Sequence, residues 1–218
     1  MEKFLIIAID GPSGVGKGTV ARAVAAALGY RHVDTGAMYR AVAWRALKDG
    51  VALGDEPALG ALAARLDIDA SEGSVKVNGV EVGGEIRTPE MDAAASRVAR
   101  VAGVRAALVA LQRRVGAAGG VVMEGRDIGT VVFPAADVKI YLDASAEERA
   151  RRRVHDAGRG EPRDPERVAS EMAARDRSDR TRDVAPLAAA ADAHLIDTTA
   201  LSIQQVVDRV LAIARAAA

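Results

Sequence analysis

Residues 11–19 read Gly11-Pro12-Ser13-Gly14-Val15-Gly16-Lys17-Gly18-Thr19, between an apolar run at residues 4–9 and an alanine-rich segment at residues 20–28. This order of strand, glycine-rich loop and helix is the context of a phosphate-binding loop. The glycines let successive backbone N–H groups point at phosphate oxygens, and the helix adds its positive N-terminal end. Lys17 supplies a positive charge for the β- and γ-phosphates. A simple turn explains one or two of the glycines but not this spacing with a lysine, so the stretch predicts a nucleoside triphosphate site.

The end of this loop departs from its commonest form, in which Ser or Thr directly follows the lysine and holds magnesium. Here Gly18 intervenes and Thr19 follows. The form Gly-x-x-Gly-x-Gly-Lys-Gly-Thr resembles the loop of nucleoside monophosphate kinases and differs from that of GTPases and ATP-driven motors. The resemblance implies that Mg²⁺ is held mostly through water and nucleotide oxygens.

The composition excludes several classes of protein. The chain has 218 residues, enough for one sizeable core with a small inserted domain, and only 3% aromatic residues, so we expect an aliphatic core. It has no cysteine, which excludes disulfides, thiolate metal sites and a cysteine nucleophile. Lys+Arg and Asp+Glu number 30 each, so no net positive field attracts a nucleic acid polymer or an anionic membrane.

The apolar runs also bear on location. None approaches membrane-spanning length. Residues 4–9 are too short for the apolar part of a signal peptide, and no small-residue cleavage site follows them. We therefore expect a cytoplasmic protein that binds no membrane.

Strand-like apolar runs alternate with helical segments along most of the chain. The runs lie at residues 4–10, 31–34, 120–124, 138–143 and 194–197. This alternation predicts a parallel sheet with helices on both faces. Capping residues mark several helix starts: Ser145 with Glu148 and Ser202 with Gln205, which have capping-box spacing, and Thr88 and Asp164, each of which precedes a proline.

Two segments interrupt the alternation. Residues 75–82 alternate apolar and polar side chains on both sides of Asn78-Gly79, a strong signal for a two-residue hairpin, and with residues 66–70 they predict a small antiparallel sheet. The sequence alone leaves open whether this hairpin is a surface decoration or part of a substrate site. Residues 156–163 are polar and lie between helices, which fits either a simple loop or a mobile lid that excludes water.

Three polar clusters complete the pattern. They read Asp-Thr-Gly-Ala-Met-Tyr-Arg at residues 34–40, Glu-Gly-Arg-Asp-Ile-Gly-Thr at residues 124–130 and Arg-Asp-Arg-Ser-Asp-Arg-Thr-Arg at residues 175–182. Ligands of open parallel sheets bind beyond the carboxyl ends of the strands. The first two clusters follow predicted strands, so we expect them to share one crevice with the phosphate loop.

The third cluster falls on a predicted helix. Arg175, Asp179 and Arg182 are spaced at i, i+4 and i+7, which places them on one face. The alternative is a solvated face with surface ion pairs, and we interpret Asp176 with Arg180 as such a pair.

A second group of arginines follows the predicted cap Ser145. Arg149 and Arg153 are also spaced at i, i+4, whereas Arg151 and Arg152 point elsewhere and are expected to face solvent.

These motifs together are similar to those of the bacterial cytidylate (CMP) kinases. The resemblance runs from about residue 7 to the C-terminus and includes Gly-Glu-Ile-Arg-Thr at residues 84–88 and Gly-Arg-Asp-Ile-Gly-Thr-Val-Val-Phe-Pro at residues 125–134. It implies a P-loop NTPase fold, a three-layer α/β/α domain with a five-stranded parallel sheet, an inserted small antiparallel sheet that binds the nucleoside monophosphate (NMP) and a short lid. The implied boundaries are a core at about 1–55, 104–153 and 166–218, an insert at about 56–103 and a lid at about 154–165.

The resemblance also implies a role for each residue of the site. ATP would be bound by Gly11, Pro12, Ser13, Gly14, Val15, Gly16, Lys17, Gly18 and Thr19, with Arg149 against the adenine. Catalysis would fall to Lys17, Arg126, Arg153 and Arg182. The monophosphate would be bound by Thr35, Arg40, Ser96, Arg105, Arg126, Asp127, Arg175, Asp179 and Arg182. Among these, Arg40, Arg126 and Arg182 would hold its phosphate.

One position departs from the family pattern. Glu124 stands where many relatives have Asp before Gly-Arg. A longer carboxylate can still orient magnesium-bound water, and Thr19 is the other residue that could reach the metal through water. No direct protein ligand to the metal is implied.

The chemistry of the residues agrees with these roles. An acceptor phosphate is already an anionic nucleophile, so the site needs positioning and positive charge and no general base. A carboxylate such as Asp127 can accept a hydrogen bond from the exocyclic amine of cytosine, whereas uracil would present a carbonyl to it. The prediction is therefore ATP-dependent, Mg²⁺-dependent phosphorylation of CMP, and of dCMP, and the resemblance implies a monomer. The alternatives are a P-loop kinase for another small acceptor, such as shikimate, and a nucleotide-binding regulator without catalysis.

Overall fold

The computed structural model describes residues 4–70, 73–155 and 164–218. The chain forms two compact units, one made of Met1–His32 with Gly116–Ala218 and the other of Val33–Val115. The predicted lid falls largely on residues 156–163, which lie outside the described residues. The predicted division into a core and an NMP-binding insert is based on the role of each part, and it stays a prediction.

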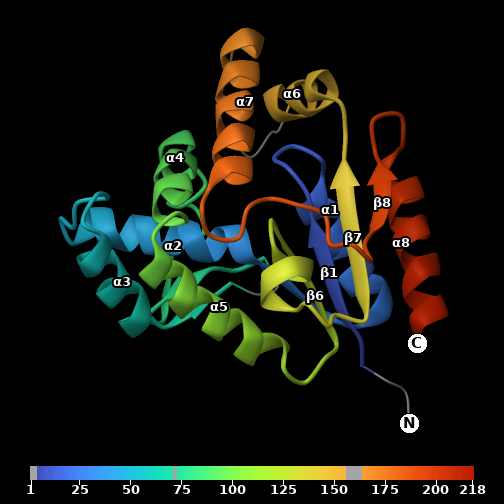
Figure 1. The fold of residues 1–218 in the computed structure, drawn as a ribbon, viewed down its shortest axis with the longest axis horizontal. Helices are drawn as coiled ribbons and strands as arrows, with labels where there is room; N and C mark the ends of the chain where they lie inside the picture. The colour runs from blue at the N-terminus through green and yellow to red at the C-terminus, as the bar shows by residue number, and fades with distance from the viewer. Residues whose placement is uncertain (1–3, 71–72, 156–163) are drawn as a thin grey trace. The chain divides into compact units, whose positions relative to one another are not determined.

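The first unit is built on a five-stranded sheet (Figure 1). Its order is β2-β6-β1-β7-β8, and β1 pairs in parallel with β6 and β7, as β7 does with β8. The strands are β1 (Ile6–Asp10), β2 (Arg31–Asp34), β6 (Val121–Gly125), β7 (Val138–Asp143) and β8 (His194–Asp197), with the chain leaving for the second unit inside β2. The predicted five-stranded parallel sheet is confirmed.

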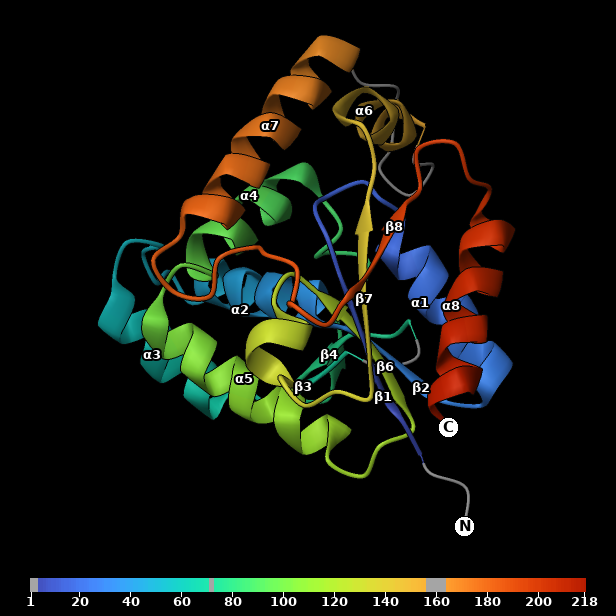
Figure 2. The ribbon, with the colours of Figure 1, turned by 45° about the vertical axis from the view of Figure 1, so that its right-hand side comes forward.

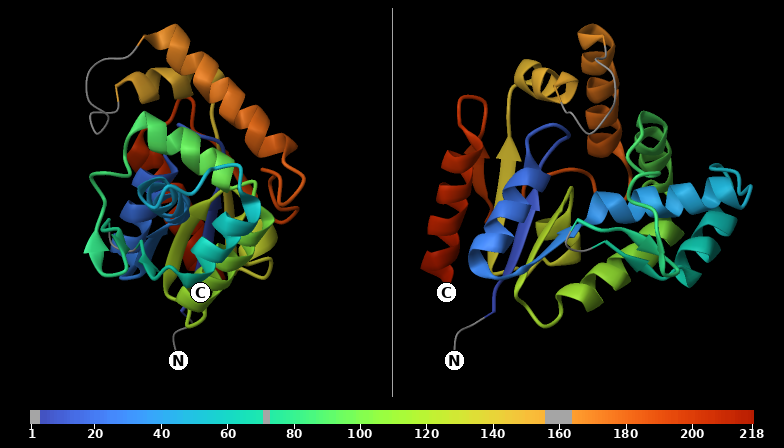
Figure 3. Two further views of the ribbon diagram at one scale, coloured as in Figure 1. Left: turned by 90° about the vertical axis from the view of Figure 1, so that its left-hand side faces the viewer. Right: turned by 180° about the vertical axis from the view of Figure 1, so that it is seen from behind.

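Aliphatic side chains form the core of this unit. Helices α1 (Lys17–Leu28) and α8 (Ile203–Ala217) pack against each other and against the strands, as the view from behind shows (Figure 3). The buried cluster contains Ile7 and Ile9 of β1, Leu142 of β7 and Val210 of α8, whereas Phe4 is 66% exposed. The expected aliphatic core is therefore present, and the first strand begins at Ile6, two residues later than predicted.

Two further helices stand beyond the carboxyl end of β7. They are α6 (Ala146–Val154), which directly follows that strand, and α7 (Pro165–Thr181), and the two pack against each other (Figure 2). A short π-helical turn, η1 (Ile128–Val132), follows β6.

The second unit combines helices with a small sheet. Its elements are α2 (Thr35–Lys48), α3 (Glu56–Arg65), β3 (Ile68–Asp69), β4 (Lys76–Val77), β5 (Val80–Glu81), α4 (Pro89–Val98) and α5 (Ala102–Gly116), which ends one residue inside the first unit. The three short strands pair antiparallel in sequence order. Asn78 and Gly79 form the hairpin turn with φ of 50° and 79°, as a two-residue turn of mirror type requires. The predicted hairpin is confirmed.

The helix starts follow the predicted caps with one correction. Ser202 and Gln205 form a complete capping box, and Thr88 and Asp164 cap α4 and α7. Ser145 accepts a hydrogen bond from the Glu148 N–H, but the Glu148 side chain does not return to Ser145. It pairs instead with Arg151 and Arg152 of α6, which occupy the carboxylate that a capping box would use.

No helix within the described ranges is long and apolar enough to cross a membrane.

Candidate active site

The phosphate loop joins β1 to α1. Gly14 and Gly16 have φ of 82° and 92°, in the left-handed region that favours glycine. Gly16 is also the residue before the first turn of α1, and because it has no side chain, none caps the amides of that turn. No capping side chain therefore occupies these N–H groups, and their binding of a phosphate stays a prediction.

Lys17 lies buried under this loop. Its Nζ donates a hydrogen bond to the carbonyl of Pro12 at 2.7 Å, so the side chain folds back along the loop. Burial lowers the pKa of Lys17 to about 7, and the nearby charge of Arg126 acts in the same direction. Bound phosphates would raise this pKa again, because their negative charge would stabilise the buried ammonium against both burial and the charge of Arg126.

Glu124 stands at the end of β6 beside α1. It is 9% exposed, and its Oε1 lies 3.4 Å from Nε2 of the buried His32. A β-carbon added to Gly18 would come within 2.8 Å of the same oxygen. The glycine between Lys17 and Thr19 therefore leaves room for this carboxylate. Thr19 itself is exposed on the first turn of α1.

A buried carboxylate supports the cluster after β6. Asp10, the last residue of β1, accepts hydrogen bonds from the amides of Ile128 and Gly129, both at 2.8 Å. Burial raises the pKa of Asp10 to about 6 even though both hydrogen bonds lower it. Asp10 thus anchors η1, which directly follows Arg126 and Asp127. Sequence reasoning missed Asp10, although a carboxylate between a strand and its phosphate loop is a visible signal.

Arg126 pairs with helix α7. Its Nε lies 2.9 Å from Oδ2 of Asp179. Burial works to lower the pKa of Arg126, but the pairing with Asp179 outweighs it and the pKa is raised. Burial likewise tends to raise the pKa of Asp179, and the charges of Arg126 and Arg175 turn the shift downward. Both shifts favour the charged forms, so the pair is an ion pair.

Arg182 forms the second pair of this kind. Its Nη2 lies 3.4 Å from Oδ1 of Asp127, and both side chains are buried. Its Nε also donates to the carbonyl of Ala185. The prediction that Arg182 lies on the helix face with Arg175 and Asp179 is wrong, since α7 ends at Thr181 and Arg182 is extended with ψ of 140°. Arg182 nevertheless reaches the predicted acceptor residues of its unit from the segment after the helix.

Arg149 is enclosed between the phosphate loop and α7. Its Nη1 donates to the carbonyl of Ser13 at 3.2 Å and to Oδ2 of Asp176, and its Nε donates to the carbonyl of Ala144 at 3.1 Å. Asp176 is only 6% exposed, whereas Arg180 is exposed. The interpretation of Asp176 with Arg180 as a surface ion pair is therefore wrong. Asp176 belongs to the buried stripe of α7, whose members recur at helical spacing: Val168, Met172, Asp176 and Asp179.

Arg152 also departs from expectation. Instead of facing solvent it is half-buried, and it donates to the hydroxyl and carbonyl of Thr198 at 2.9 and 2.6 Å and to Glu148 at 2.7 Å. Arg151 is exposed, as expected. Arg153 is half-buried on α6.

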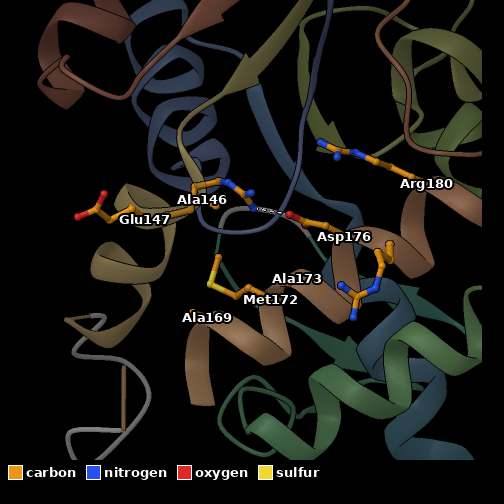
Figure 4. Close-up of a pocket in the computed structure, with 9 residues that line it drawn as sticks. Ala146, Glu147, Ala169, Met172, Ala173, Asp176 and Arg180 are labelled. Carbon is orange, nitrogen blue, oxygen red and sulfur yellow. Dashed lines mark hydrogen bonds and ion pairs between the residues drawn. The ribbon is translucent and has the colours of Figure 1, made fainter. Parts of the chain in front are cut away.

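A cavity of about 350 Å³ lies between α6 and α7 (Figure 4). The close-up shows Met172 and Asp176 projecting from α7, with the ion pair of Asp176 marked. The cavity is lined by Ala146, Glu147, Arg149, Ala169, Met172, Ala173, Asp176, Arg177 and Arg180.

The second unit holds the other predicted acceptor residues. Arg40 lies between two carboxylates, with Nη2 3.0 Å from Asp34 and Nη1 3.6 Å from Asp92. The hydroxyl of Ser96 donates at 3.1 Å to the backbone carbonyl of Asp92, one turn earlier in α4. Sequence reasoning did not single out Asp92.

Two more predicted residues lie in this unit. Arg105 is 3% exposed, and its Nη1 donates to the Tyr39 hydroxyl at 3.2 Å. Thr35 is buried in the first turn of α2. The predicted acceptor residues therefore fall into two sets, one in each unit.

Within residues 4–70, 73–155 and 164–218, no group of three or more Asp, Glu and His side chains is arranged to hold a metal ion.

The family of the chain follows from comparison with known proteins. The model of the cytidylate kinase family matches residues 7–216. The chain belongs to the cytidylate kinase family. A cytidylate kinase of Geobacillus sp. is 50% identical over 98% of this chain and 97% of its own length, and one of Solibacter usitatus is 49% identical over 98% and 94%. One of Pelotomaculum thermopropionicum is 50% identical over 97% and 96%.

Solved structures with low sequence identity share the fold. A gluconokinase from Sinorhizobium meliloti aligns with a TM-score of 0.52 at 18% identity, over 99% of this chain and 95% of its own. The protein TT1252 from Thermus thermophilus aligns with a TM-score of 0.51 at 19% identity, over 99% and 98%. The predicted P-loop kinase fold with an additional small antiparallel sheet is thus confirmed.

Proposed function

We propose that this cytidylate kinase family member transfers the γ-phosphoryl group of ATP to CMP, and also to dCMP, giving the diphosphate. The observation that carries the proposal is the register of two neighbouring strands. Asp10 of β1 lies opposite Gly125 of β6, so the phosphate loop and Arg126 leave the sheet side by side. A donor loop and a charged arginine at one edge suit the meeting of two phosphates.

On the donor side, the amides of the loop and of the first turn of α1 would hold the ATP phosphates, and the Lys17 ammonium would contact the β- and γ-phosphates. Mg²⁺ bound to the nucleotide would neutralise charge on its phosphate oxygens. We propose that Glu124 and Thr19 reach it only through water. The position of Glu124 against Gly18, at the base of the loop, fits such an indirect role.

On the acceptor side, Arg126 and Arg182 would grip the CMP phosphate, with Arg40 of the second unit as the third arginine. Each is already paired with a carboxylate, Asp179, Asp127 or Asp34. The guanidinium fork keeps its charge and can bind phosphate with two nitrogens, so the carboxylates would hold the forks in place until substrate arrives. Arg153 would act on the transferred phosphoryl group.

The nucleoside would be read by the remaining residues. We propose that Asp127, Ser96 and Arg105 bind the cytosine, Arg175 and Asp179 bind the ribose, and Thr35 lies beside the acceptor. A lid at about 154–165 would exclude water. The protein would work as a cytoplasmic monomer on free nucleotides, without a nucleic acid polymer.

A coupled assay for ADP formation tests the proposal. CMP and dCMP should be much better acceptors than UMP, AMP and shikimate, because Asp127 would face a carbonyl in uracil. ATP binding without turnover on any acceptor would favour a nucleotide-binding regulator, and preference for shikimate would favour the other kinase.

Two variants test individual roles. Lys17→Ala should lower turnover by orders of magnitude with little change in folding. Asp127→Ala should weaken the binding of CMP far more than the binding of ATP. Equal losses of affinity for both substrates would contradict a base-reading role.

A further inference from the structure

The Arg149–Asp176 pair connects α7 to the backbone of the phosphate loop. Asp176 accepts a hydrogen bond from Nη1 of Arg149, and the same nitrogen donates to the carbonyl of Ser13. Nε of Arg149 is occupied by the carbonyl of Ala144, at the start of α6. The guanidinium is thus held at both ends, and its orientation depends on Asp176.

The Ser13 carbonyl is part of a peptide unit that matters for phosphate binding. In a trans peptide the carbonyl and the following N–H point in opposite directions. Because the Ser13 carbonyl accepts from Arg149, the Gly14 N–H is directed away from Arg149. The packing supports this fixed orientation, since a β-carbon on Gly14 would lie 2.7 Å from Met172 of α7 and 3.0 Å from the carbonyl of Arg149.

Both members of the pair are removed from solvent. Arg149 is 7% exposed and Asp176 is 6% exposed, so each charge relies on the other. A neutral residue at position 176 would leave the guanidinium buried without its anionic partner. Such a group tends to move or to admit water, and the Ser13 carbonyl would lose its fixed donor.

We propose that Asp176 is a positioning residue for ATP binding, which acts through Arg149 to hold the Ser13–Gly14 peptide with its N–H toward the phosphates. The inference rests on the proposed function only in taking this loop as the ATP site. It concerns donor binding and is independent of which acceptor the enzyme uses.

The test measures ATP affinity without acceptor, by calorimetry on the full chain. Asp176→Asn should weaken ATP binding at least tenfold, with the KM for CMP changed less than about threefold. Asp176→Glu keeps the charge and should recover most of the affinity. In ¹⁵N-glycine NMR spectra, the Gly14 amide resonance should move in Asp176→Asn. Unchanged ATP affinity together with an unmoved Gly14 amide would overturn the proposal.

A matched control lies on the same helix. Glu171 pairs with Arg167 at 3.0 Å, with side-chain exposures of 44% and 73%. Glu171→Gln should leave ATP affinity and the Gly14 resonance unchanged, and a loss equal to that of Asp176→Asn would show a general charge effect and refute the inference.

A second variant covers the case in which Asp176→Asn does not fold. Arg149→Lys keeps a positive charge beside Asp176 but replaces Nη1 and Nε with one nitrogen, which cannot stand both at the Ser13 carbonyl and at the Ala144 carbonyl. It should lose ATP affinity at least tenfold, and wild-type affinity would overturn the proposal. A wild-type chain that binds ATP but does not phosphorylate CMP would instead refute the proposed function.

Discussion

The Glu124 side chain occupies the space beside the backbone of Gly18. A methyl group there would lie 2.8 Å from Oε1 of Glu124, and His32 stands 3.4 Å from the same oxygen. We expect Gly18→Ala to displace the carboxylate and to lower kcat at least tenfold. The unfolding free energy should change by less than about 1 kcal/mol, because alanine favours the helix. Steady-state kinetics at several Mg²⁺ concentrations and urea unfolding provide the measurements.

Two companion variants separate this effect from a general glycine effect. Gly18→Ala combined with Glu124→Asp should recover part of the activity, because the shorter carboxylate needs less room. Gly54→Ala should behave as wild type, because this glycine is exposed and an added β-carbon would have none of the described atoms within 4 Å. Full activity of Gly18→Ala alone would show that the Glu124 position does not matter.

The charge of Lys17 predicts a pH dependence of ATP binding. Its pKa is lowered to about 7, chiefly by burial, and the phosphates of ATP should raise it again. ATP binding at pH 8 should therefore take up about one proton, and the affinity should fall by up to about tenfold per unit from pH 7 to 9. Calorimetry in buffers of different ionisation enthalpy measures the uptake. No uptake and a flat profile would contradict the shift.

The same pKa shift makes the stability of the ligand-free protein rise with pH, whereas the affinity for ATP falls. The unfolded chain keeps the Lys17 proton up to about pH 10.5, whereas the folded, ligand-free chain releases it near pH 7. Between these values the unfolded state binds more protons, so the Lys17 contribution to the unfolding free energy rises with pH. Lys17→Arg should remove this contribution.

At the scale of single elements, α8 depends on its first turn. The Ser202 hydroxyl accepts from the Gln205 N–H, and the Gln205 side chain accepts from the Ser202 N–H. Ser202→Ala should lower the unfolding free energy by about 1 kcal/mol, measured by urea denaturation. Ser170, exposed within α7, provides the control, and equal effects of Ser170→Ala and Ser202→Ala would exclude a capping contribution.

Local sequence predicted such elements well. The strands β2, β7 and β8 have the predicted bounds, and the Asn78-Gly79 hairpin forms because its turn geometry is set by adjacent residues. The failures lie where a charged side chain had an alternative partner, either one helical turn away or far along the chain. The Glu148 side chain pairs with two arginines instead of completing the capping box, and α7 ends at Thr181, before Arg182.

For the molecule as a whole, stability should rest on aliphatic packing. Leu108 of α5 is 1% exposed, whereas Leu47 of α2 is 42% exposed. Leu108→Ala should lower the unfolding free energy by about 2–5 kcal/mol, because it removes transfer energy and leaves a cavity. Leu47→Ala should cost less than about 1 kcal/mol. Urea unfolding of both variants makes the comparison, and similar losses would show that the site around Leu108 collapses to fill the space.

The sequence by itself determined the phosphate loop, the alternation that builds the parallel sheet and the motifs that mark the cytidylate kinase family. These depend on neighbouring residues, on helical or strand periodicity, or on the strand ends, which parallel topology brings to one edge. Only the tertiary structure decided that Asp176 is a buried partner of Arg149, 27 residues away, and that Asp10 holds the turn after Asp127. Exposure and pairing of a charged residue depend on what packs against its element. That contact comes from distant parts of the chain, which periodicity does not reveal.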